Sequence, residues 1–150
     1  MTRLTLRIKL ENEARLPHRI PRVTQQHNVL VVDDDDAIRA LVTRVLQRHL
    51  YSVEQASNGE EAMTKLRQSK FDVVLLDLMM PVMSGFEVID QLATESPLQA
   101  VVVMSAASEG DFQRVNGAAV VQSVIRKPFE LSELLEAVRR SANGEPGLPR

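Results

Sequence analysis

The sequence predicts an α/β fold in which helices cover both faces of an open, doubly wound parallel sheet. Two observations support this prediction. Between residues 28 and 142, short runs of β-branched residues alternate five times with longer stretches of helical periodicity. Consecutive βα units of this kind form a parallel sheet with helices packed on its two faces. The runs are also apolar without alternation, as is typical of strands that are buried on both faces.

The first βα unit contains a run of four aspartates. Its strand is predicted at residues 28–33, with the sequence NVLVVD, and its helix has one apolar stripe formed by Ile38, Leu41, Val42, Val45 and Leu46. Asp36 is expected to be the N-cap of this helix, and Asp35 is expected to favour the positive end of the helix dipole. These roles leave Asp33 and Asp34 to be explained, although a charge run can also be a solvated loop.

The other four units follow the same pattern. Further strands are predicted at residues 51–56, 71–77, 98–105 and 119–127. Further helices are predicted at residues 59–70, 86–95, 108–117 and 131–142. Asn58-Gly59 marks the turn before the second helix, and Pro81 and Gly85 mark a loop after the third strand.

The patterned region, residues 28–142, is expected to be one domain between two short terminal segments. Residues 1–27 hold six Lys/Arg and two Glu, a net charge of +4, and are expected to form a flexible basic extension. A basic arm that binds a partner is the alternative. Residues 143–150 are expected to be a short tail, too short for an output domain, so the domain is expected to stand alone.

The composition indicates a soluble globular protein, because 44% of the residues are hydrophobic and 25% are charged. The chain has no cysteine, which excludes disulfides and thiolate metal sites. It lacks both a membrane-spanning apolar run and a secretory signal, so we expect cytoplasmic localisation and no membrane insertion. Residues 28–150 carry a net charge of −6, which argues against direct binding to nucleic acid.

Polar side chains stand at the carboxyl ends of four of the five predicted strands. Asp33 and Asp34 follow the first strand, and Asp77 ends the third. Ser105 ends the fourth strand, and Lys127 ends the fifth. Ligands of doubly wound sheets bind at this edge of the sheet. We therefore expect three carboxylates, a hydroxyl and an ammonium to converge there.

This set of side chains is suited to phosphoryl transfer. Neighbouring carboxylates repel one another, and a hard divalent cation such as Mg²⁺ removes the conflict by taking oxygen ligands. An aspartate can itself be a nucleophile and form an aspartyl-phosphate. A cation, the Ser105 hydroxyl and the Lys127 ammonium would then provide one partner for each equatorial oxygen of the phosphoryl group.

Four segments in this order, VLVVDDD, DLMMPVMSG, VVVMSAAS and RKPFE, resemble the receiver domain of bacterial two-component response regulators. The resemblance covers residues 28–142. It implies a flavodoxin-like doubly wound (βα)5 fold with a parallel sheet in the order 2-1-3-4-5, as in stand-alone chemotaxis regulators.

The resemblance also implies a role for each polar residue. Asp77 would be the phosphoacceptor, Ser105 the switch hydroxyl and Lys127 a contact of the phosphoryl group. The implied Mg²⁺ ligands are Asp33, Asp34, Asp77 and the backbone carbonyl of Met79. A cis peptide bond is expected between Lys127 and Pro128.

The function implied by the resemblance is a phosphorylation-dependent switch rather than an enzyme. The phosphoryl group would come from a sensor histidine kinase or a histidine phosphotransfer protein, and the signal would pass to another protein by contact. Val124 stands where the family usually has Tyr or Phe, so a degenerate receiver that binds partners constitutively is an alternative. An aspartyl-phosphate hydrolase is disfavoured, because Met79 occupies the place of its second aspartate.

Overall fold

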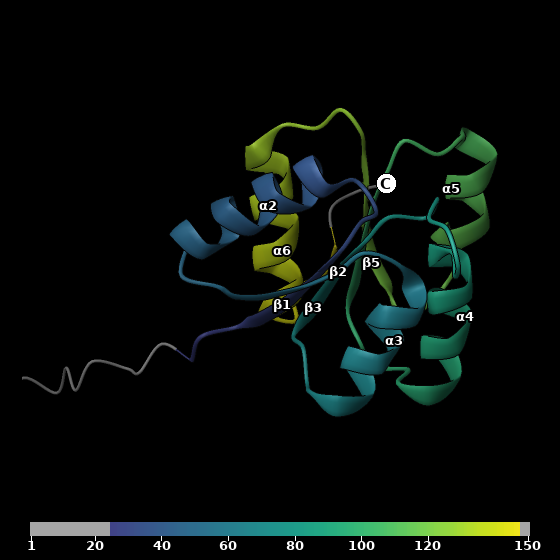
Figure 1. Ribbon diagram of the computed structural model, residues 1–150, viewed down its shortest axis with the longest axis horizontal. Helices are drawn as coiled ribbons and strands as arrows, with labels where there is room; N and C mark the ends of the chain where they lie inside the picture. The colour runs from purple at the N-terminus through teal and green to yellow at the C-terminus, as the bar shows by residue number, and fades with distance from the viewer. Residues whose placement is uncertain (1–24, 148–150) are drawn as a thin grey trace, which may run out of the picture.

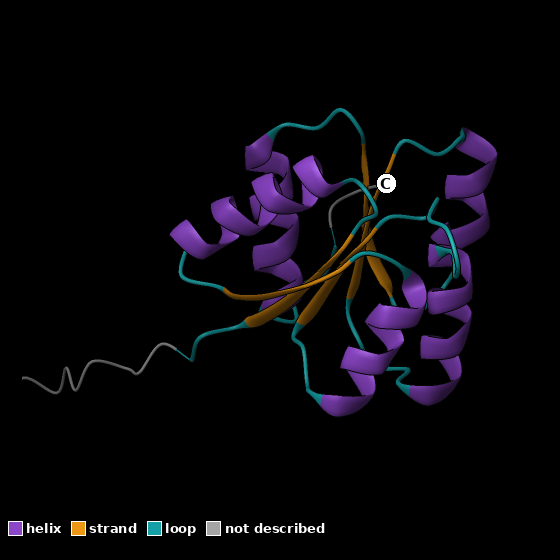
Figure 2. Ribbon diagram, in the orientation of Figure 1, coloured by secondary structure: helices purple, strands orange, loops and turns teal. Residues whose placement is uncertain are grey.

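The computed structural model describes residues 25–147, which form a five-stranded parallel sheet with helices on both faces (Figure 1, Figure 2). The order of the strands is β2-β1-β3-β4-β5. The strands are β1 (Asn28–Val32), β2 (Ser52–Ala56), β3 (Val73–Leu76), β4 (Val101–Ser105) and β5 (Val121–Arg126). The predicted fold class and strand order are confirmed.

Five helices alternate with these strands, as the sequence pattern predicts. They are α2 (Asp36–Arg48), α3 (Gly59–Gln68), α4 (Gly85–Glu95), α5 (Glu109–Asn116) and α6 (Leu131–Ala142). Ser84 caps α4 and Ser108 caps α5, each in a capping box with the acidic residue three positions later. The short polar residues before the apolar stripes therefore fix where these two helices begin.

The N-cap of α2 is Asp35, and the prediction of Asp36 was wrong by one residue. Asp35 has extended backbone angles, and its carboxylate accepts hydrogen bonds from the amides of Ala37 and Ile38. Asp36 already belongs to the helix and forms an ion pair with Arg39 one turn later. Any of the adjacent aspartates could cap the helix, and the choice depends on backbone angles that the composition does not reveal.

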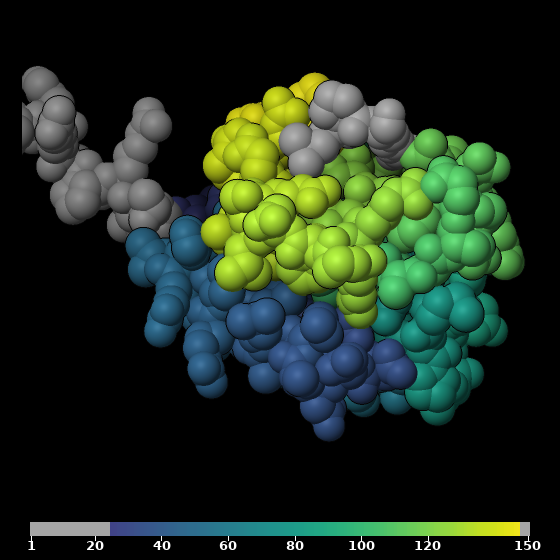
Figure 3. Space-filling model, turned by 90° about the horizontal axis from the view of Figure 1, so that it is seen from above, coloured from purple at the N-terminus to yellow at the C-terminus, as the bar shows by residue number. Residues whose placement is uncertain are grey.

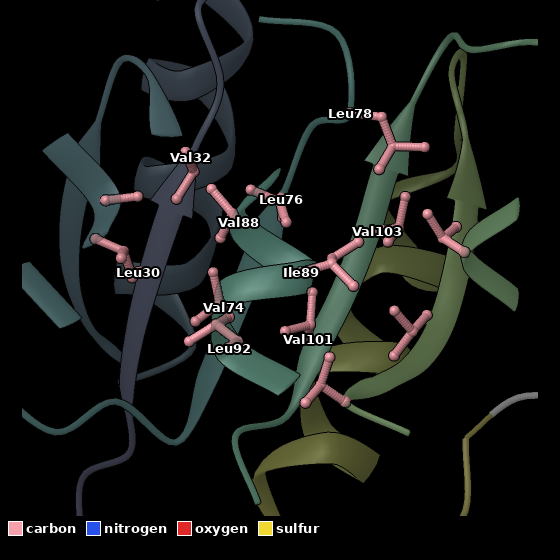
Figure 4. Packing of buried hydrophobic residues seen from close by; sticks show 14 of the residues in the cluster. Leu30, Val32, Val74, Leu76, Leu78, Val88, Ile89, Leu92, Val101 and Val103 are labelled. Atoms are coloured by element: carbon pink, nitrogen blue, oxygen red, sulfur yellow. The ribbon is translucent and has the colours of Figure 1, made fainter. Parts of the chain in front are cut away.

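Two apolar layers hold the helices against the sheet. Because β1 is buried on both faces, Val29 and Val31 pack toward α2 and α6, whereas Leu30 and Val32 pack toward the opposite layer. Figure 4 shows part of this second layer, in which side chains of β1, β3 and β4 meet three residues of α4, namely Val88, Ile89 and Leu92. Each buried aliphatic side chain contributes roughly 1.5–3 kcal/mol to folding, so these layers give the site a rigid base.

The last two strands begin later than predicted. Leu98, expected to open β4, is 98% exposed and lies in the turn after α4, and pairing starts only at Val101. Ala119 precedes the start of β5, because Val121 donates its amide hydrogen bond back to Ala118 in a turn. Apolar turn residues extended both predicted strands, since hydrophobicity alone does not mark where hydrogen bonding begins.

The division of the chain into extension, domain and tail stays a prediction. Most of the predicted extension, residues 1–24, and the last three residues of the predicted tail lie outside the described residues. Within residues 25–147, no helix combines the length and the apolar character that crossing a membrane requires.

Candidate functional site

Three carboxylates meet at the carboxyl edge of the sheet. Asp33 follows β1, Asp77 follows the neighbouring β3, and one oxygen from each of Asp33, Asp34 and Asp77 lies within 4.8 Å of the others. Asp33 is 0% exposed and Asp77 is 5% exposed, whereas Asp34 is open to solvent. Two buried acids and one exposed acid are therefore positioned to hold a metal ion from one side. Hard oxygen donors that leave room for water match the preference of Mg²⁺.

Lys127 joins two of these carboxylates. Its Nζ lies 2.6 Å from an oxygen of Asp33 and 3.3 Å from an oxygen of Asp77. The ammonium comes from the loop after β5, and its side chain is only 16% exposed. The peptide bond between Lys127 and Pro128 is cis, as expected. The positive charge is thus held over the two buried acids and partly neutralises them.

Ser105 contacts the other side of Asp77. Its hydroxyl donates a 2.6 Å hydrogen bond to Oδ1 of Asp77 and is itself 0% exposed. The amide of Ala107 donates a 3.3 Å hydrogen bond to the same hydroxyl oxygen. The backbone amide of Lys127 donates to the carbonyl of Ser105 at 2.9 Å, which ties the ends of β4 and β5 together. Asp77 therefore lies between a hydroxyl and an ammonium.

Burial and charge act against each other in this cluster. Burial raises the pKa of Asp33 above the ordinary 3.8, although the hydrogen bond from Lys127 and that from the amide of Asp35 oppose the rise. Burial also lowers the pKa of the Lys127 ammonium, but its contacts with Asp33 and Asp77 outweigh that effect and raise the pKa above 10.5. Lys127 thus stays charged, and Asp33 retains its proton more readily than an exposed aspartate does.

A metal ion at this site should compete with protons for Asp33. We expect the Mg²⁺ affinity to fall as the pH is lowered, starting above the ordinary aspartate pKa of 3.8, because burial raises the pKa of Asp33. Calorimetric titrations of the protein with Mg²⁺ from mildly alkaline to mildly acidic pH would measure the change. An affinity that stays constant until the pH reaches 3.8 would contradict the expectation.

The loop after β3 lies directly against the acid cluster. The amide of Met79 donates a 3.3 Å hydrogen bond to Oδ1 of Asp77, while the side chain of Met79 is exposed. The role of the Met79 carbonyl as a metal ligand stays a prediction. Val82 adopts a φ of 70°, which is unfavourable for a β-branched residue, and its side chain is also exposed. Gly85 closes the loop by donating its amide hydrogen to the carbonyl of Leu78 at 2.9 Å.

Arg39 on the first helix contacts the site, which the sequence pattern did not predict. Its guanidinium donates a 2.6 Å hydrogen bond to the backbone carbonyl of Asp33 and a 3.2 Å hydrogen bond to the side chain of Gln55. The spacing of Asp36 and Arg39 at i and i+3 is a local signal that could have predicted their ion pair. The contacts with Gln55 and with the Asp33 carbonyl depend on the tertiary fold.

Val124, in the position that lacks the usual aromatic ring, is half-buried beside α5. It lines a hollow together with Phe112 and Arg126. The guanidinium of Arg126 stacks on the ring of Phe112 at 4.5 Å from the ring centre and forms an ion pair with Glu109. A cation–aromatic contact therefore joins β5 to α5 next to the valine.

The space-filling view from above shows how close the segments around the site come to one another in space (Figure 3). The blue surface of α2 borders the yellow-green surface of the chain after β5, although these segments are far apart in the sequence. The five predicted polar residues all lie at the carboxyl edge of the sheet, namely Asp33, Asp34, Asp77, Ser105 and Lys127. The roles predicted for these residues stay predictions.

A doubly wound domain with an acidic cluster, a hydroxyl and an ammonium at the carboxyl edge of its sheet has the architecture of a signal receiver. The family model of the response regulator receiver domain matches residues 29–139. The chain therefore belongs to the response regulator receiver domain family.

Curated relatives share this region of the chain. The transcriptional regulatory protein ResD of Bacillus subtilis is 37% identical over 117 residues, which cover 77% of this chain and 48% of ResD. The response regulator MprA of Mycolicibacterium vanbaalenii is 39% identical over 112 residues, which cover 74% of this chain and 48% of MprA. The chain thus spans about half the length of these relatives.

Solved structures resemble nearly the whole described domain. The response regulator TrrA of Thermotoga maritima, solved in complex with Mg²⁺-BeF, has a TM-score of 0.70 and 31% identity. The match covers 77% of this chain and 99% of TrrA. The chemotaxis response regulator CheY4 of Vibrio cholerae has a TM-score of 0.71 and 31% identity, with 77% of this chain and 98% of CheY4 covered.

Proposed function

We propose that the domain is a phosphorylation-dependent switch that accepts a phosphoryl group on Asp77. The observation that carries this proposal is the placement of Asp77 between the Ser105 hydroxyl at 2.6 Å and the Lys127 ammonium at 3.3 Å, beside Asp33 and Asp34. A lone surface carboxylate would have no partners for the charge of a phosphoryl group. Asp77 has one on each side.

The donor is a phosphohistidine of a sensor kinase or of a phosphotransfer protein. An oxygen of Asp77 attacks the phosphorus, a new O–P bond forms, and the P–N bond to the imidazole breaks. The leaving imidazole keeps the electron pair of the broken bond and takes up a proton from solvent. The transfer is balanced without any further reactant.

The residues around Asp77 stabilise the transferred group. The Ser105 hydroxyl, which now donates to the Asp77 carboxylate, can donate to an oxygen of the phosphoryl group instead. The Lys127 ammonium can exchange part of its contact with Asp33 for a second oxygen. A Mg²⁺ ion held by Asp33, Asp34, Asp77 and the carbonyl of Met79 would neutralise the charge on the third oxygen.

The comparisons support this proposal without extending to partners. TrrA was solved with Mg²⁺-BeF, which resembles a phosphoryl group and its metal, and ResD and MprA are named as regulators. Transcriptional regulation is part of the name of ResD, and the match covers only 48% of that protein. For the domain described here we propose output through contact with another protein.

Replacing Asp77 with asparagine should abolish phosphorylation. Incubation of the unaltered protein with acetyl phosphate and Mg²⁺ should add one phosphoryl group, detected by intact mass and removed by hydroxylamine, because acyl phosphates are labile to it. Asp77→Asn should show no added mass, since an amide is not a nucleophile for this transfer. The matched control is Asp90→Asn, because Asp90 is an exposed acid on α4 away from the strand ends.

Two outcomes would contradict the proposal. A phosphoryl group that persists in Asp77→Asn would place the acceptor elsewhere. No incorporation in the unaltered protein, from acetyl phosphate or from phosphorylated kinase, would instead favour a degenerate receiver that binds partners without phosphate.

A further inference from the structure

Arg39 connects three parts of the chain at the edge of the acid cluster. Its Nη1 donates to the Asp33 carbonyl at 2.6 Å, its Nε donates to Gln55 at 3.2 Å, and its Nη2 contacts Asp36 at 2.5 Å. The side chain is only 16% exposed, although it stands in the first turns of a surface helix. A solvated arginine would not be enclosed in this way. The contacts tie α2 to the end of β2 and to the loop after β1.

The two neighbouring acids differ in how their side chains are held. The Asp33 carboxylate is fixed by Lys127 at 2.6 Å and by the amide of Asp35 at 2.9 Å. Within residues 25–147, no described hydrogen bond or ion pair reaches the Asp34 carboxylate. The direction of the Asp34 side chain therefore depends on its backbone. The peptide that joins Asp33 to Asp34 is the one whose carbonyl oxygen Arg39 holds.

We propose that Arg39 is a positioning residue that directs Asp34 toward the metal by holding the carbonyl of the Asp33–Asp34 peptide. The inference rests on the proposed function only in taking Asp34 as a Mg²⁺ ligand. A guanidinium suits this task because its planar donors can hold several acceptors in fixed directions at once. A lysine at this place would carry the same charge but would present a single point of attachment.

The charge of Arg39 works against the same metal ion. A guanidinium near a cation site repels the cation, so an effect of charge alone would make Mg²⁺ bind more tightly when Arg39 is neutralised. Positioning has the opposite sign, because a misdirected ligand weakens binding. Arg39→Lys separates the two effects, since it keeps the charge and removes the geometry.

The test is the Mg²⁺ dissociation constant of Arg39→Lys, measured by calorimetry on the folded protein without phosphodonor. We expect the affinity to fall by roughly tenfold, the lower end of the range for residues that orient metal ligands. Arg44→Lys is the matched control, because Arg44 is an exposed residue of the same helix, and its affinity should equal that of the unaltered protein. Amide exchange at Asp34 and Asp35 should also quicken in Arg39→Lys without metal.

The rate of phosphorylation by acetyl phosphate provides the second readout. At saturating Mg²⁺, Arg39→Lys should reach the phosphorylation rate of the unaltered protein, because the substitution lowers the occupancy of the metal site and leaves phosphoryl transfer unchanged. Unchanged or tighter Mg²⁺ binding in Arg39→Lys would overturn the inference. If that variant does not fold, Gln55→Leu can be used, because it removes one acceptor of Arg39. This variant should also bind Mg²⁺ more weakly than the unaltered protein. If Arg39→Lys binds Mg²⁺ more weakly but the unaltered protein is not phosphorylated, the proposed function is rejected and the positioning role of Arg39 stands.

Discussion

Replacing Lys127 with methionine should destabilise the metal-free protein by about 3 kcal/mol, because removing one partner of a buried ion pair leaves an uncompensated charge. The ammonium lies 2.6 Å from Asp33, which is 0% exposed, and 3.3 Å from Asp77. The two acids would then face each other without a counter-charge. Urea denaturation in the presence of a chelator would measure the loss.

The sign of the pH and metal dependence follows from the same contacts. Without Lys127, the folded-state pKa of Asp33 rises further above 3.8, so stability is lost as the pH rises through the range between the unfolded and folded pKa values. The destabilisation should therefore be smaller at acidic pH. Mg²⁺ should restore part of the stability by mass action.

A matched variant separates this effect from the loss of any surface charge. Lys70 is exposed at the end of the α3 region and makes no described ion pair within residues 25–147. Lys70→Met should change the free energy of unfolding by less than about 0.5 kcal/mol, as surface substitutions usually do. Equal losses of unfolding free energy in Lys127→Met and Lys70→Met would show that the Lys127 charge stabilises the fold no more than an exposed charge does.

Replacing Gly85 with alanine should destabilise the fold by about 2–3 kcal/mol, the upper part of the range for overpacked positions. A Cβ atom at this position would overlap the backbone carbonyl of Asp77 and come within 2.8 Å of the Cα of Leu78. Neither atom can rotate away, because both belong to the backbone that follows β3. The loop must therefore shift and carry the Asp77 carboxylate with it.

The control for this variant is Gly110→Ala, which should have the opposite sign. A Cβ on Gly110 would meet nothing closer than the Ser108 hydroxyl at 3.8 Å. Gly110 lies in the first turn of α5, where alanine is favoured over glycine by at most the roughly 0.5–1 kcal/mol of a helix interior. Thermal unfolding and acetyl phosphate labelling of both variants would check the prediction. If Gly85→Ala unfolds and is labelled like the unaltered protein, the loop accommodates the added Cβ atom and the prediction is wrong.

The arrangement of strands and helices could be predicted because its signal is repeated along the chain. The run from Val29 to Val32 is apolar at every position, and β1 is buried on both faces as that pattern predicts. The meeting of Asp33 with Asp77 follows in turn, since β1 and β3 are parallel neighbours whose ends coincide. The rule that binding residues of parallel sheets lie at the carboxyl ends of the strands therefore predicted that five polar residues would lie close together.

The details that escaped prediction depend on individual backbone angles and on tertiary contacts. The N-cap of α2 is Asp35 and not the predicted Asp36, because the extended backbone angles of Asp35 direct its carboxylate at the helix amides. The anchoring of Arg39 on the Asp33 carbonyl needs β2, which provides Gln55, to be packed beside β1. The close approach of Gly85 to Asp77 likewise exists only once the loop has closed.

The contact between Lys127 and Asp33 joins residues that are 94 positions apart in the sequence. Closing so long a segment is entropically costly, and the contact forms only when β5 has docked on the edge of the sheet. A chain still emerging from the ribosome has three acids of the cluster well before it has the lysine that pairs with them. The order of synthesis therefore makes the charge-balanced pocket one of the last parts of the domain to be completed, and a chain interrupted before β5 would lack it.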